Sequence, residues 1–309
     1  MFASPSILLA HEDTIWDVLW AKDSKVITCS VDETIKIWDA KGCELVGVIK
    51  GYDYAIVSID LNKDDTKILA TTMGHCLEVW DFDSLKLQKR IRAGPMDAWK
   101  AKFINNDKMA ICGSDKGVLT LWDLDLEVSN KYDGSIGSGM VSILDSTKKQ
   151  LINCVASGEV DSLVVAGNSV GNIYTFDLAR SQLISEFMAH SDIVRDVILG
   201  KDNSLVYSCS DDKRIMVYDV RYKNAVMSLQ GHDGWVMGIS LCLDDRLLSS
   251  ASSDSTCKLW DMRTRSCCQT LATRSSEVWD VSFERYSDAP RLVSVGDDRC
   301  IQFFNPISL

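Results

Sequence analysis

Two stretches of this chain, SSDSTCKLWD at residues 252–261 and CSVDETIKIWD at residues 29–39, are near copies although more than 200 residues separate them. Both end in an aromatic residue and Asp after a run of strand-forming residues. The same kind of ending recurs in KIWD, EVWD, TLWD, YTFD, MVYD, KLWD and QFFN, with the aromatic residues Trp38, Trp80, Trp122, Phe176, Tyr218, Trp260 and Phe304. Their spacings are 42, 42, 54, 42, 42 and 44 residues, which indicates seven repeats of one unit.

The period and the ends of the repeat predict the fold. A period of about 40 to 45 residues with a Gly-His start and a Trp-Asp end is typical of WD40 propeller blades. Gly231-His232 starts the sixth copy completely, and Ala189-His190 and Ala10-His11 start the fifth and first copies nearly so. Each copy holds four strand-like runs, such as VMGISL, LLSSAS, TCKLWD and SCCQTL. Because one such sheet cannot bury both its faces alone, we predict an all-β, seven-bladed WD40 β-propeller over residues 1–309 as a single domain.

The two ends of the chain indicate how the ring closes. Residues 305–309 are too few for a fourth strand of the last blade, whereas residues 5–10 (PSILLA) form an apolar run before the first blade. We therefore predict that residues 6–10 become the outer strand of the last blade, which also covers a sheet edge. We expect no membrane span and no secretory signal, because the apolar runs are too short.

Composition favours an intracellular protein that binds other proteins. The eleven cysteines form no CxxC pair and lie mostly in strand patterns, as expected for small buried residues in a reducing compartment, here cytoplasm and nucleus. The net charge is -11, and we expect no basic cluster beyond Arg263 and Arg265. Such a chain repels phosphate backbones, so proteins rather than nucleic acids or membranes are the expected partners.

Three copies share polar residues that have the composition of a hydrolase triad. The sets are His11, Thr28, Asp32 and Trp38; His190, Ser208 and Asp212, with Tyr218 in place of Trp; and His232, Ser250, Asp254 and Trp260. An esterase or peptidase that uses His232, Ser250 and Asp254 is the enzymatic alternative. Because the same set recurs around the ring, we instead interpret each as a buried hydrogen-bonded network and predict no enzymatic activity.

The sequence also gives little support for a metal site or a cofactor site. His75 is the only His outside these sets, with no second His or Cys pair at ligand spacing, so we predict no metal site. Neither GxGxxG nor GKS/T occurs, and we predict no cofactor.

Comparison of equivalent positions predicts a binding surface on one face, which we call the top face. Counting back 22 to 25 residues from each aromatic marker reaches the start of the innermost strand, at Trp16, Val57, Trp99, Asn153, Arg195, Met237 and Trp279. Trp235 lies just upstream of Met237, and acidic turn residues recur as Asp115, Asp211 and Asp297. Large aromatic anchors and carboxylates suit a peptide with an Arg and an apolar side chain. The predicted contacts are Trp16, Trp99, Arg195, Trp235, Met237, Trp279, Asp115, Asp211 and Asp297. The alternatives are that these Trp rings pack between blades and that the acids are solvated turn residues.

The 54-residue spacing contains 12 extra residues. With the inner strand of blade four at residues 151–156, the surplus falls in residues 123–150, a connection between blades three and four on the top face. An inner strand beginning at Met140 would instead move the insertion to the opposite face.

Three longer stretches resemble a particular family. AGPMDAWKAKF at residues 93–103, residues 231–271, and residues 277–307 with EVWDVSF and LVSVGDDRCIQFF look like the eukaryotic superkiller-complex WD-repeat subunit, the eighth superkiller protein. Blade four departs most, with Val170 where the turn Asp would stand. The resemblance implies a non-catalytic scaffold, monomeric by itself, that binds a tetratricopeptide subunit and a helicase in a complex that supports 3′-to-5′ messenger RNA decay by the exosome. It also implies a second role with the polymerase-associated factor complex in transcription. Another WD40 adaptor, such as a ubiquitin-ligase substrate receptor, is the alternative.

Overall fold

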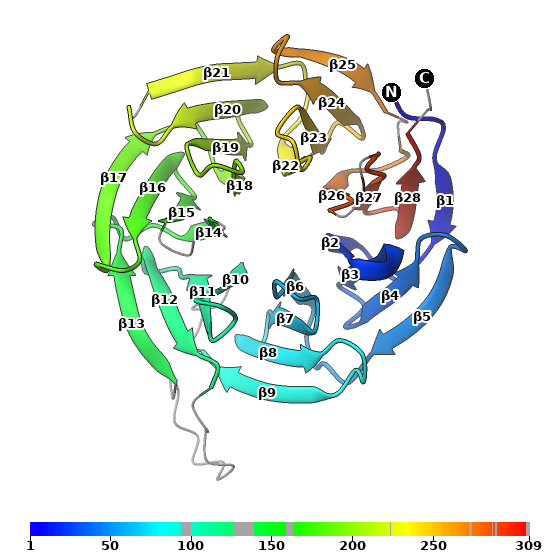
Figure 1. Cartoon of the computed structure of the whole chain (residues 1–309), viewed down its shortest axis with the longest axis horizontal. Coiled ribbons are helices and arrows are strands. Elements are labelled where there is room, and N and C mark those ends of the chain that lie inside the picture. The colour runs from blue at the N-terminus through cyan, green and yellow to red at the C-terminus, as the bar shows by residue number, and fades with distance from the viewer. Residues whose placement is uncertain are drawn as a thin grey trace.

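The computed structural model describes residues 1–93, 100–125, 139–158, 163–222, 224–271, 274–285, 287 and 289–306. Within these ranges, 28 strands form seven four-stranded antiparallel sheets that stand as blades around a ring (Figure 1). The prediction of an all-β, seven-bladed propeller is confirmed. This part of the chain has one short 3-10 helix, η1 (Lys22–Ser24), and no helix long and apolar enough to cross a membrane.

The blades follow one another in chain order, each running from its inner strand outward. Blade one contains β2 (Ile15–Ala21), β3 (Lys25–Ser30), β4 (Ile35–Asp39) and β5 (Glu44–Ile49). Blade two contains β6 (Ile56–Leu61), β7 (Lys67–Thr72), β8 (Cys76–Asp81) and β9 (Leu87–Arg92). Blade three contains β10 (Ala101–Ile104), β11 (Met109–Gly113), β12 (Val118–Asp123) and β13 (Met140–Asp145). Blade four contains β14 (Ile152–Ser157), β15 (Leu163–Asn168), β16 (Asn172–Asp177) and β17 (Gln182–Met188).

The last three blades repeat the pattern, except that the chain's first strand completes the seventh. Blade five contains β18 (Val194–Leu199), β19 (Leu205–Ser210), β20 (Arg214–Asp219) and β21 (Asn224–Gln230). Blade six contains β22 (Val236–Leu241), β23 (Leu247–Ser252), β24 (Cys257–Asp261) and β25 (Ser266–Thr270). Blade seven contains β26 (Val278–Phe283), β27 (Leu292–Gly296), β28 (Cys300–Phe304) and β1 (Ser6–Leu9).

The ring closes through β1, as predicted from the two chain ends. This strand pairs antiparallel with β28, from Ser6 opposite Phe303 to Leu9 opposite Cys300. Phe2 adds a second attachment, because its ring is buried and its backbone N–H and C=O both bond to the side-chain amide of Gln269 in blade six. The N-terminal residues therefore contact blades six and seven.

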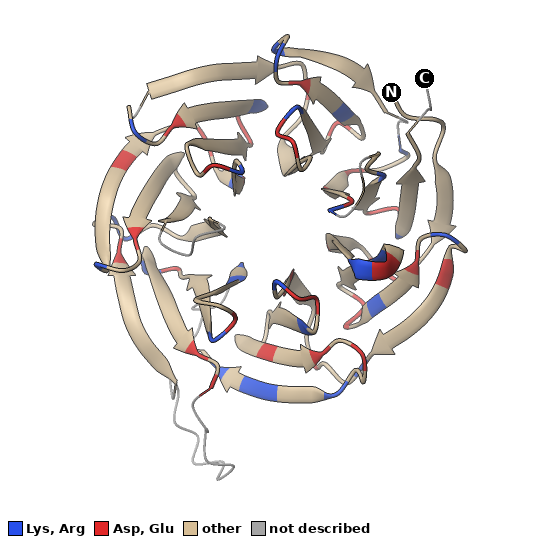
Figure 2. Ribbon diagram, viewed as in Figure 1, with Lys and Arg blue, Asp and Glu red and all other residues tan. Residues whose placement is uncertain are grey.

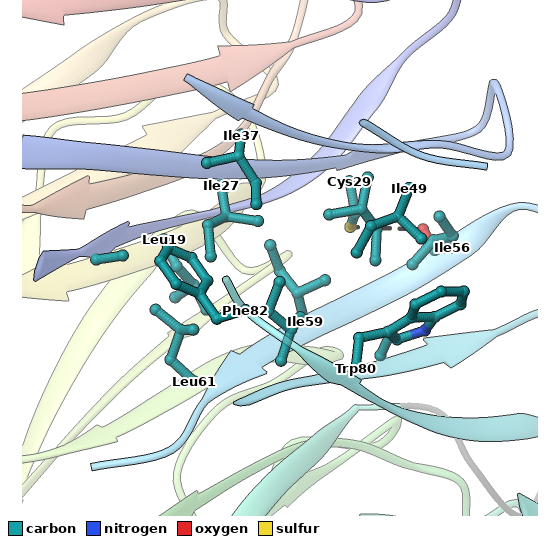
Figure 3. Close-up of a cluster of buried hydrophobic side chains, with 14 of the residues drawn as sticks. Leu19, Ile27, Cys29, Ile37, Ile49, Ile56, Ile59, Leu61, Trp80 and Phe82 are labelled. Carbon is teal, nitrogen blue, oxygen red and sulfur yellow. Dashed lines mark hydrogen bonds between the residues drawn. The ribbon is translucent and has the colours of Figure 1, made fainter. Parts of the chain in front are cut away.

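The hydrophobic core lies between the blades. In the cluster between blades one and two, Leu19 and Ile27 of blade one pack with Ile59, Trp80 and Phe82 of blade two (Figure 3). Alternating side chains of each strand point to opposite faces of the sheet, so each blade buries one face against either neighbour. No blade can fold stably alone, because its burial requires the next one.

A β-bulge marks the start of six of the seven inner strands. The pairing register between the inner and second strands shifts at the residues that we aligned from the sequence, namely Trp16, Val57, Asn153, Arg195, Met237 and Trp279. The seventh aligned position, Trp99, lies outside the described residues. A bulge leaves its extra residue unpaired and changes the direction of its side chain. The aligned positions thus share one backbone geometry.

The extra residues fall within the predicted range 123–150, and the inner strand of blade four, β14, lies close to the predicted 151–156, but the connection differs from the prediction. Met140–Asp145 form β13, the outer strand of blade three, which pairs with β12. The surplus therefore connects β12 to β13 within blade three, and the link between blades three and four is the short stretch 146–151. The prediction of a top-face connection between blades three and four is wrong, because MVSILD can pair as an outer strand. Residues 126–138 lie outside the described part.

Candidate protein-interaction surface

The top face carries two kinds of connection. Because the four strands of a blade are antiparallel, the links from outer strand to next inner strand and from second to third strand emerge on the same side. The bulge positions begin the inner strands there, and the turn acids lie in the links from second to third strand. The two sets of predicted residues therefore share one face.

Trp16 of blade one and Trp279 of blade seven lie against each other on this face. Their ring centroids are 6.2 Å apart, with the planes tilted by 49°. The Nε1–H of Trp279 donates a 2.6 Å hydrogen bond to Oδ1 of Asp297, and the hydroxyl of Thr14 donates to the same oxygen at 3.1 Å. Both rings are half-buried, so each is held in place while part of its surface remains accessible.

A second aromatic site combines blades five and six. The guanidinium of Arg195 donates two 2.7 Å hydrogen bonds to the two carboxylate oxygens of Asp211. Its Cζ lies 5.6 Å from the centre of the Trp235 ring, in cation–π geometry. Trp235 is 46% exposed, and its backbone exchanges hydrogen bonds with Ser253. The ring is thus exposed on a fixed loop.

The other predicted contacts differ in accessibility. Met237 is only 7% exposed, so the structure contradicts its assignment to the exposed patch; the bulge turns its side chain inward, and Trp235 is exposed instead. Asp211 is also 7% exposed, and Arg195 occupies both its oxygens, so it orients Arg195 rather than awaiting a partner's cation. Asp115 is exposed. Trp99 lies outside the described residues.

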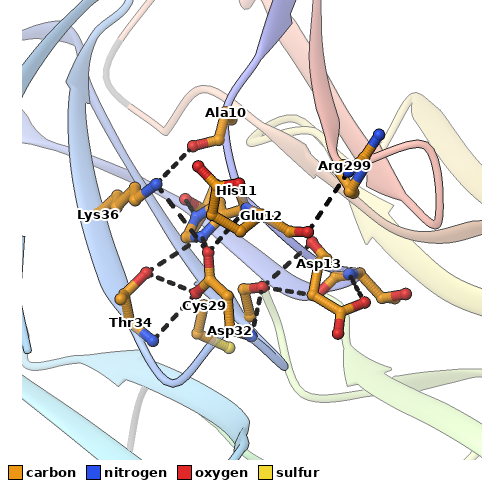
Figure 4. A network of polar contacts seen from close by, with 12 residues as sticks. Ala10, His11, Glu12, Asp13, Cys29, Asp32, Thr34, Lys36 and Arg299 are labelled. Carbon is orange, nitrogen blue, oxygen red and sulfur yellow. Dashed lines mark hydrogen bonds and ion pairs between the residues drawn. The ribbon is translucent and has the colours of Figure 1, made fainter.

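The three predicted polar networks are present as hydrogen-bonded chains. In blade one, Trp38 Nε1–H donates to the Thr28 hydroxyl at 3.0 Å, and that oxygen lies 2.7 Å from Nε2 of His11. Nδ1 of His11 lies 2.8 Å from Asp32, which can only accept (Figure 4). A neutral His11 with its proton on Nδ1 therefore satisfies every member, since Thr28 then donates to Nε2.

The same geometry repeats in blades five and six. His190 contacts Asp212 at 2.9 Å and Ser208 at 2.8 Å, while the hydroxyl of Tyr218, which replaces the Trp, donates to the carbonyl of Ala189. His232 contacts Asp254 at 2.8 Å and Ser250 at 2.7 Å, and Trp260 donates to Ser250 at 2.8 Å.

Burial and hydrogen bonding shift the pKa values of the network members. Burial lowers the pKa of His11 despite the opposing effect of Asp32, which favours the neutral ring. Burial alone would raise the pKa of Asp32, but hydrogen bonds from His11 and Thr34 outweigh it and hold that pKa well below its usual range. The carboxylate stays ionised next to a neutral imidazole.

These sets resemble a hydrolase triad in their hydrogen bonds but not in their accessibility to a substrate. Ser250 has the Asp-His-Ser connectivity, yet it is fully buried and its oxygen accepts from Trp260. A nucleophile must come within bonding distance of a substrate carbonyl. In this structure, no substrate can reach Ser250.

Sequence reasoning missed two replacements of the network. In blade seven, Arg274 donates to Asp298 and to the Ser294 hydroxyl, as His232 contacts Asp254 and Ser250 in blade six. Its 24-residue distance to Asp298, against 22 in blade six, could have signalled the equivalence.

In blade two, the buried carboxylate of Glu78 accepts from Nε1 of Trp80 at 3.0 Å and pairs with Arg90 at 2.6 Å. Glu78 stands two residues before the marker Trp80, a position that the repeat alignment did not compare.

Sequence reasoning also missed a basic strand. Figure 2 shows a blue band on β9, where Lys89, Arg90 and Arg92 lie close together, so Arg263 and Arg265 are not the only cluster. Lys89 donates to the carbonyls of Asp123 and Leu124 at the end of β12, and Arg90 pairs with Glu78. Two of the three cations thus support neighbouring structure.

The described residues contain no group of three or more His, Cys, Asp or Glu arranged to hold a metal ion. The cysteines are unpaired, and six are buried: Cys29, Cys112, Cys154, Cys209, Cys242 and Cys257. Cys267 and Cys268 on β25 are exposed, unlike the buried cysteines expected from the sequence.

The fold and its networks define a seven-bladed propeller with WD40 repeats. The family model "WD domain, G-beta repeat" matches residues 4–39, 181–219 and 223–261. Each of these segments holds one of the three His-Asp networks. The chain is 26% identical over 62% of its length to the WD repeat-containing protein VIP3 of Arabidopsis thaliana. It is 27% identical over 50% to the WD repeat-containing protein SL1-17 of Schistosoma mansoni. It is 32% identical over 33% to the COMPASS component SWD3 of Saccharomyces cerevisiae.

The family model covers less than half of the chain, and each relative matches only part of it. The matched regions span 62%, 53% and 35% of the three relatives' own lengths.

Proposed function

We propose that this protein is a non-catalytic scaffold that binds partner proteins through its top face. The observation that carries the proposal is the Trp16–Trp279 pair, which joins the first and last blades and is fixed by Asp297. Large aromatic side chains that are already ordered lose little entropy on binding, and such residues dominate interface energetics. The exposed Trp235 beside Arg195 adds a second anchor on the same face.

The chemistry of the face suits a short peptide with one Arg and one large apolar residue. Both hydrogen bonds to Asp297 reach Oδ1, and no partner within the described residues takes Oδ2. A guanidinium at Oδ2 would form a charge-assisted hydrogen bond beside the Trp279 ring. The apolar residue would then lie on the accessible part of the half-buried Trp16 ring or on the exposed Trp235 ring.

We further propose that the complex served is the superkiller complex, with a tetratricopeptide subunit and a helicase as partners. The support is the sequence resemblance of residues 93–103, 231–271 and 277–307 to that family. In this proposal the protein works in cytoplasm and nucleus, supports exosome-mediated messenger RNA decay, and has a second role with the polymerase-associated factor complex.

The test compares tagged proteins purified from the native cells, with co-purifying chains identified by mass spectrometry. The variants are Trp279→Ala and Trp235→Ala on the top face. The control is Tyr222→Ala, because Tyr222 is 71% exposed in a link from third to outer strand, on the opposite face. Thermal melting checks that each variant is folded.

Loss of partners from the top-face variants, with retention by Tyr222→Ala, supports the scaffold proposal. Equal recovery by all variants contradicts it. The identity of the partners tests the assignment to the superkiller complex. Recovery of the helicase and the tetratricopeptide subunit supports that assignment, whereas recovery of cullin-linked partners supports a ubiquitin-ligase adaptor.

A further inference from the structure

The inner strands carry charged residues that the proposed scaffold function does not use. The residue after each position aligned from the sequence is Asp17, Ser58, Lys100, Cys154, Asp196, Gly238 or Asp280, one in each blade. Four of them, Asp17, Lys100, Asp196 and Asp280, line a cavity of about 510 Å³ that is bounded by the inner strands of all seven blades. The set contains three carboxyl groups and a single ammonium group.

Two of the carboxylates that line this cavity, Asp196 and Asp60, are each paired with a Lys side chain. Lys100 Nζ lies 2.7 Å from Asp196, and Lys102 Nζ lies 2.8 Å from Asp60. Asp60 also accepts a hydrogen bond from the backbone N–H of Phe103 in the next blade. Asp60 and Asp196 thus each have a Lys side chain as a paired cation.

Asp17 and Asp280 bridge blades in the same way but without a cation. Oδ2 of Asp280 accepts the N–H of Val18 at 3.1 Å, from blade seven to blade one, and Oδ2 of Asp17 accepts the N–H of Ile59 at 2.9 Å, from blade one to blade two. Within the described part of the chain, neither carboxyl group forms an ion pair with Lys or Arg. The side chain of Asp280 also makes a hydrogen-bond contact with the side chain of Asp17, so the two carboxyl groups meet where the ring closes.

The Asp280 carboxyl group is also confined on its other side. A Cβ atom added to Gly238 of blade six would lie 2.4 Å from Oδ1 of Asp280 and 3.1 Å from the carbonyl oxygen of Trp279. Blade six thus encloses Asp280 opposite Asp17 and Val18. Two like charges in such a space repel strongly, and protonation of one removes the repulsion.

We propose that Asp17 and Asp280 share one proton, held as a carboxyl-to-carboxylate hydrogen bond between blades one and seven, and that its release at rising pH weakens ring closure. One side chain then donates its O–H while both keep the backbone bonds to Val18 and Ile59. On release the proton passes to solvent through the cavity, and two carboxylates remain.

The electrostatics of the surrounding groups agree with this proton. Burial raises the pKa of Asp280 well above its usual range, and the neighbouring Asp17 and Asp196 raise it further, against the opposing effect of Lys100. Cys29 on β3 faces the same carboxyl groups, and burial keeps its own pKa well above the usual range, so it adds no charge. Ser58 and Gly238 at the adjoining positions carry no charge.

The direction of the pH dependence follows from the raised pKa. In the unfolded chain Asp280 loses its proton near pH 3.9, roughly the value of a free Asp. The stabilisation from the protonated form is thus fully present below that pH and is lost as pH rises through the higher folded-state value. An Asn at position 280 keeps the neutral state at every pH, and its side-chain N–H can donate to Asp17.

The experiment measures urea unfolding of the whole protein from about pH 5 to about pH 9, a range above the free Asp value. We expect the stability of Asp280→Asn relative to wild type to increase with pH. The matched control is Asp60→Asn, which removes a carboxylate paired with Lys102 and should be less stable than wild type across the same range. A constant difference between Asp280→Asn and wild type would overturn the proposal.

Infrared spectroscopy of the wild type tests the proton directly, even if Asp280→Asn does not fold. We expect the C=O stretch of a neutral carboxyl group at about pH 7, where free Asp is fully ionised, and its loss as pH rises. A spectrum without that band at this pH would refute the shared proton. If Asp280→Asn folds, it should lack the band.

Discussion

The indole N–H of Trp279 donates a 2.6 Å hydrogen bond to Asp297, and the same carboxylate oxygen accepts from Thr14 of blade one. This bond sets the orientation of the ring that faces Trp16. The aromatic pair is therefore ordered before any partner arrives, and its order depends on residues from two blades that are nearly 300 positions apart in the chain.

The first prediction separates the ring of Trp279 from its hydrogen bond. Trp279→Ala should weaken partner binding by at least about 2 kcal/mol, roughly 30-fold, as expected for an aromatic anchor. Trp279→Phe keeps an aromatic ring but loses the donor, and should cost about tenfold through poorer orientation. Calorimetric titration with the co-purified partner measures both. Wild-type affinity for the Phe variant would mean that the bond to Asp297 is irrelevant to binding.

The second prediction concerns the buried network of blade six. Asp254→Ala leaves the Nδ1–H of His232 and the N–H of Asp233 without their acceptor. The expected loss of unfolding free energy is about 1 to 3 kcal/mol, because the His232 ring is buried, whereas water can replace Asp254 at the exposed N–H of Asp233. Urea denaturation measures the loss, and Asp233→Ala, an exposed acid in the same loop, is the control and should change stability by less than about 0.5 kcal/mol. Equal effects of the two variants would contradict the network.

The third prediction concerns the loss of folding stability at low pH. Hydrogen bonds hold the pKa of Asp32 below its unfolded value, so the stability from its ionised form is present above about pH 4 and is lost as pH falls further. Burial lowers the pKa of His11, so its neutral form adds stability above about pH 6.5 that fades below it. Urea unfolding should therefore show falling stability as pH drops.

Asp32→Asn removes the carboxylate part of this acid dependence. Its stability should fall less steeply than that of the wild type between about pH 5 and pH 3, around the free Asp value. Parallel curves for the two proteins would show that Asp32 titrates alike in the folded and unfolded states.

The fourth prediction tests how tightly blade seven approaches blade six. In Gly238→Ala, the new methyl group would lie 2.4 Å from Oδ1 of Asp280, and the Trp279 backbone limits any shift. Overpacking of this kind costs about 1 to 3 kcal/mol. The control is Gly42→Ala, whose Cβ would be no closer than 3.4 Å to a flexible Glu44 side chain. Thermal melting should show a lower Tm for Gly238→Ala, and equal Tm values would refute the close packing.

Several features were accessible from the sequence because each is fixed by local spacing. The seven aromatic markers predicted the number of blades, and the run at residues 6–10 predicted the closing strand. The sets around His11, His190 and His232 predicted three networks, since equivalent positions in equivalent blades must fall at equivalent places.

Other features required coordinates because they depend on strand pairing and side-chain direction within a blade, which the repeat spacing does not fix. Met237 and Trp235 are two residues apart, yet only the local bulge decides that the first is buried and the second exposed. Asp211 was predicted to contact a partner, but its carboxylate accepts hydrogen bonds from Arg195 of the same blade. The extra 12 residues could be placed only when β13 was seen to pair with β12.

The sequence by itself determined the blade, the number of blades and the three His-Asp networks, because these arise within about 40 residues of repeating pattern. Tertiary structure alone decided what lies between the first and last blades, namely the Trp16–Trp279 pair and the Asp17–Asp280 pair. These contacts depend on closing the ring, and ring closure brings together residues that no repeat spacing relates.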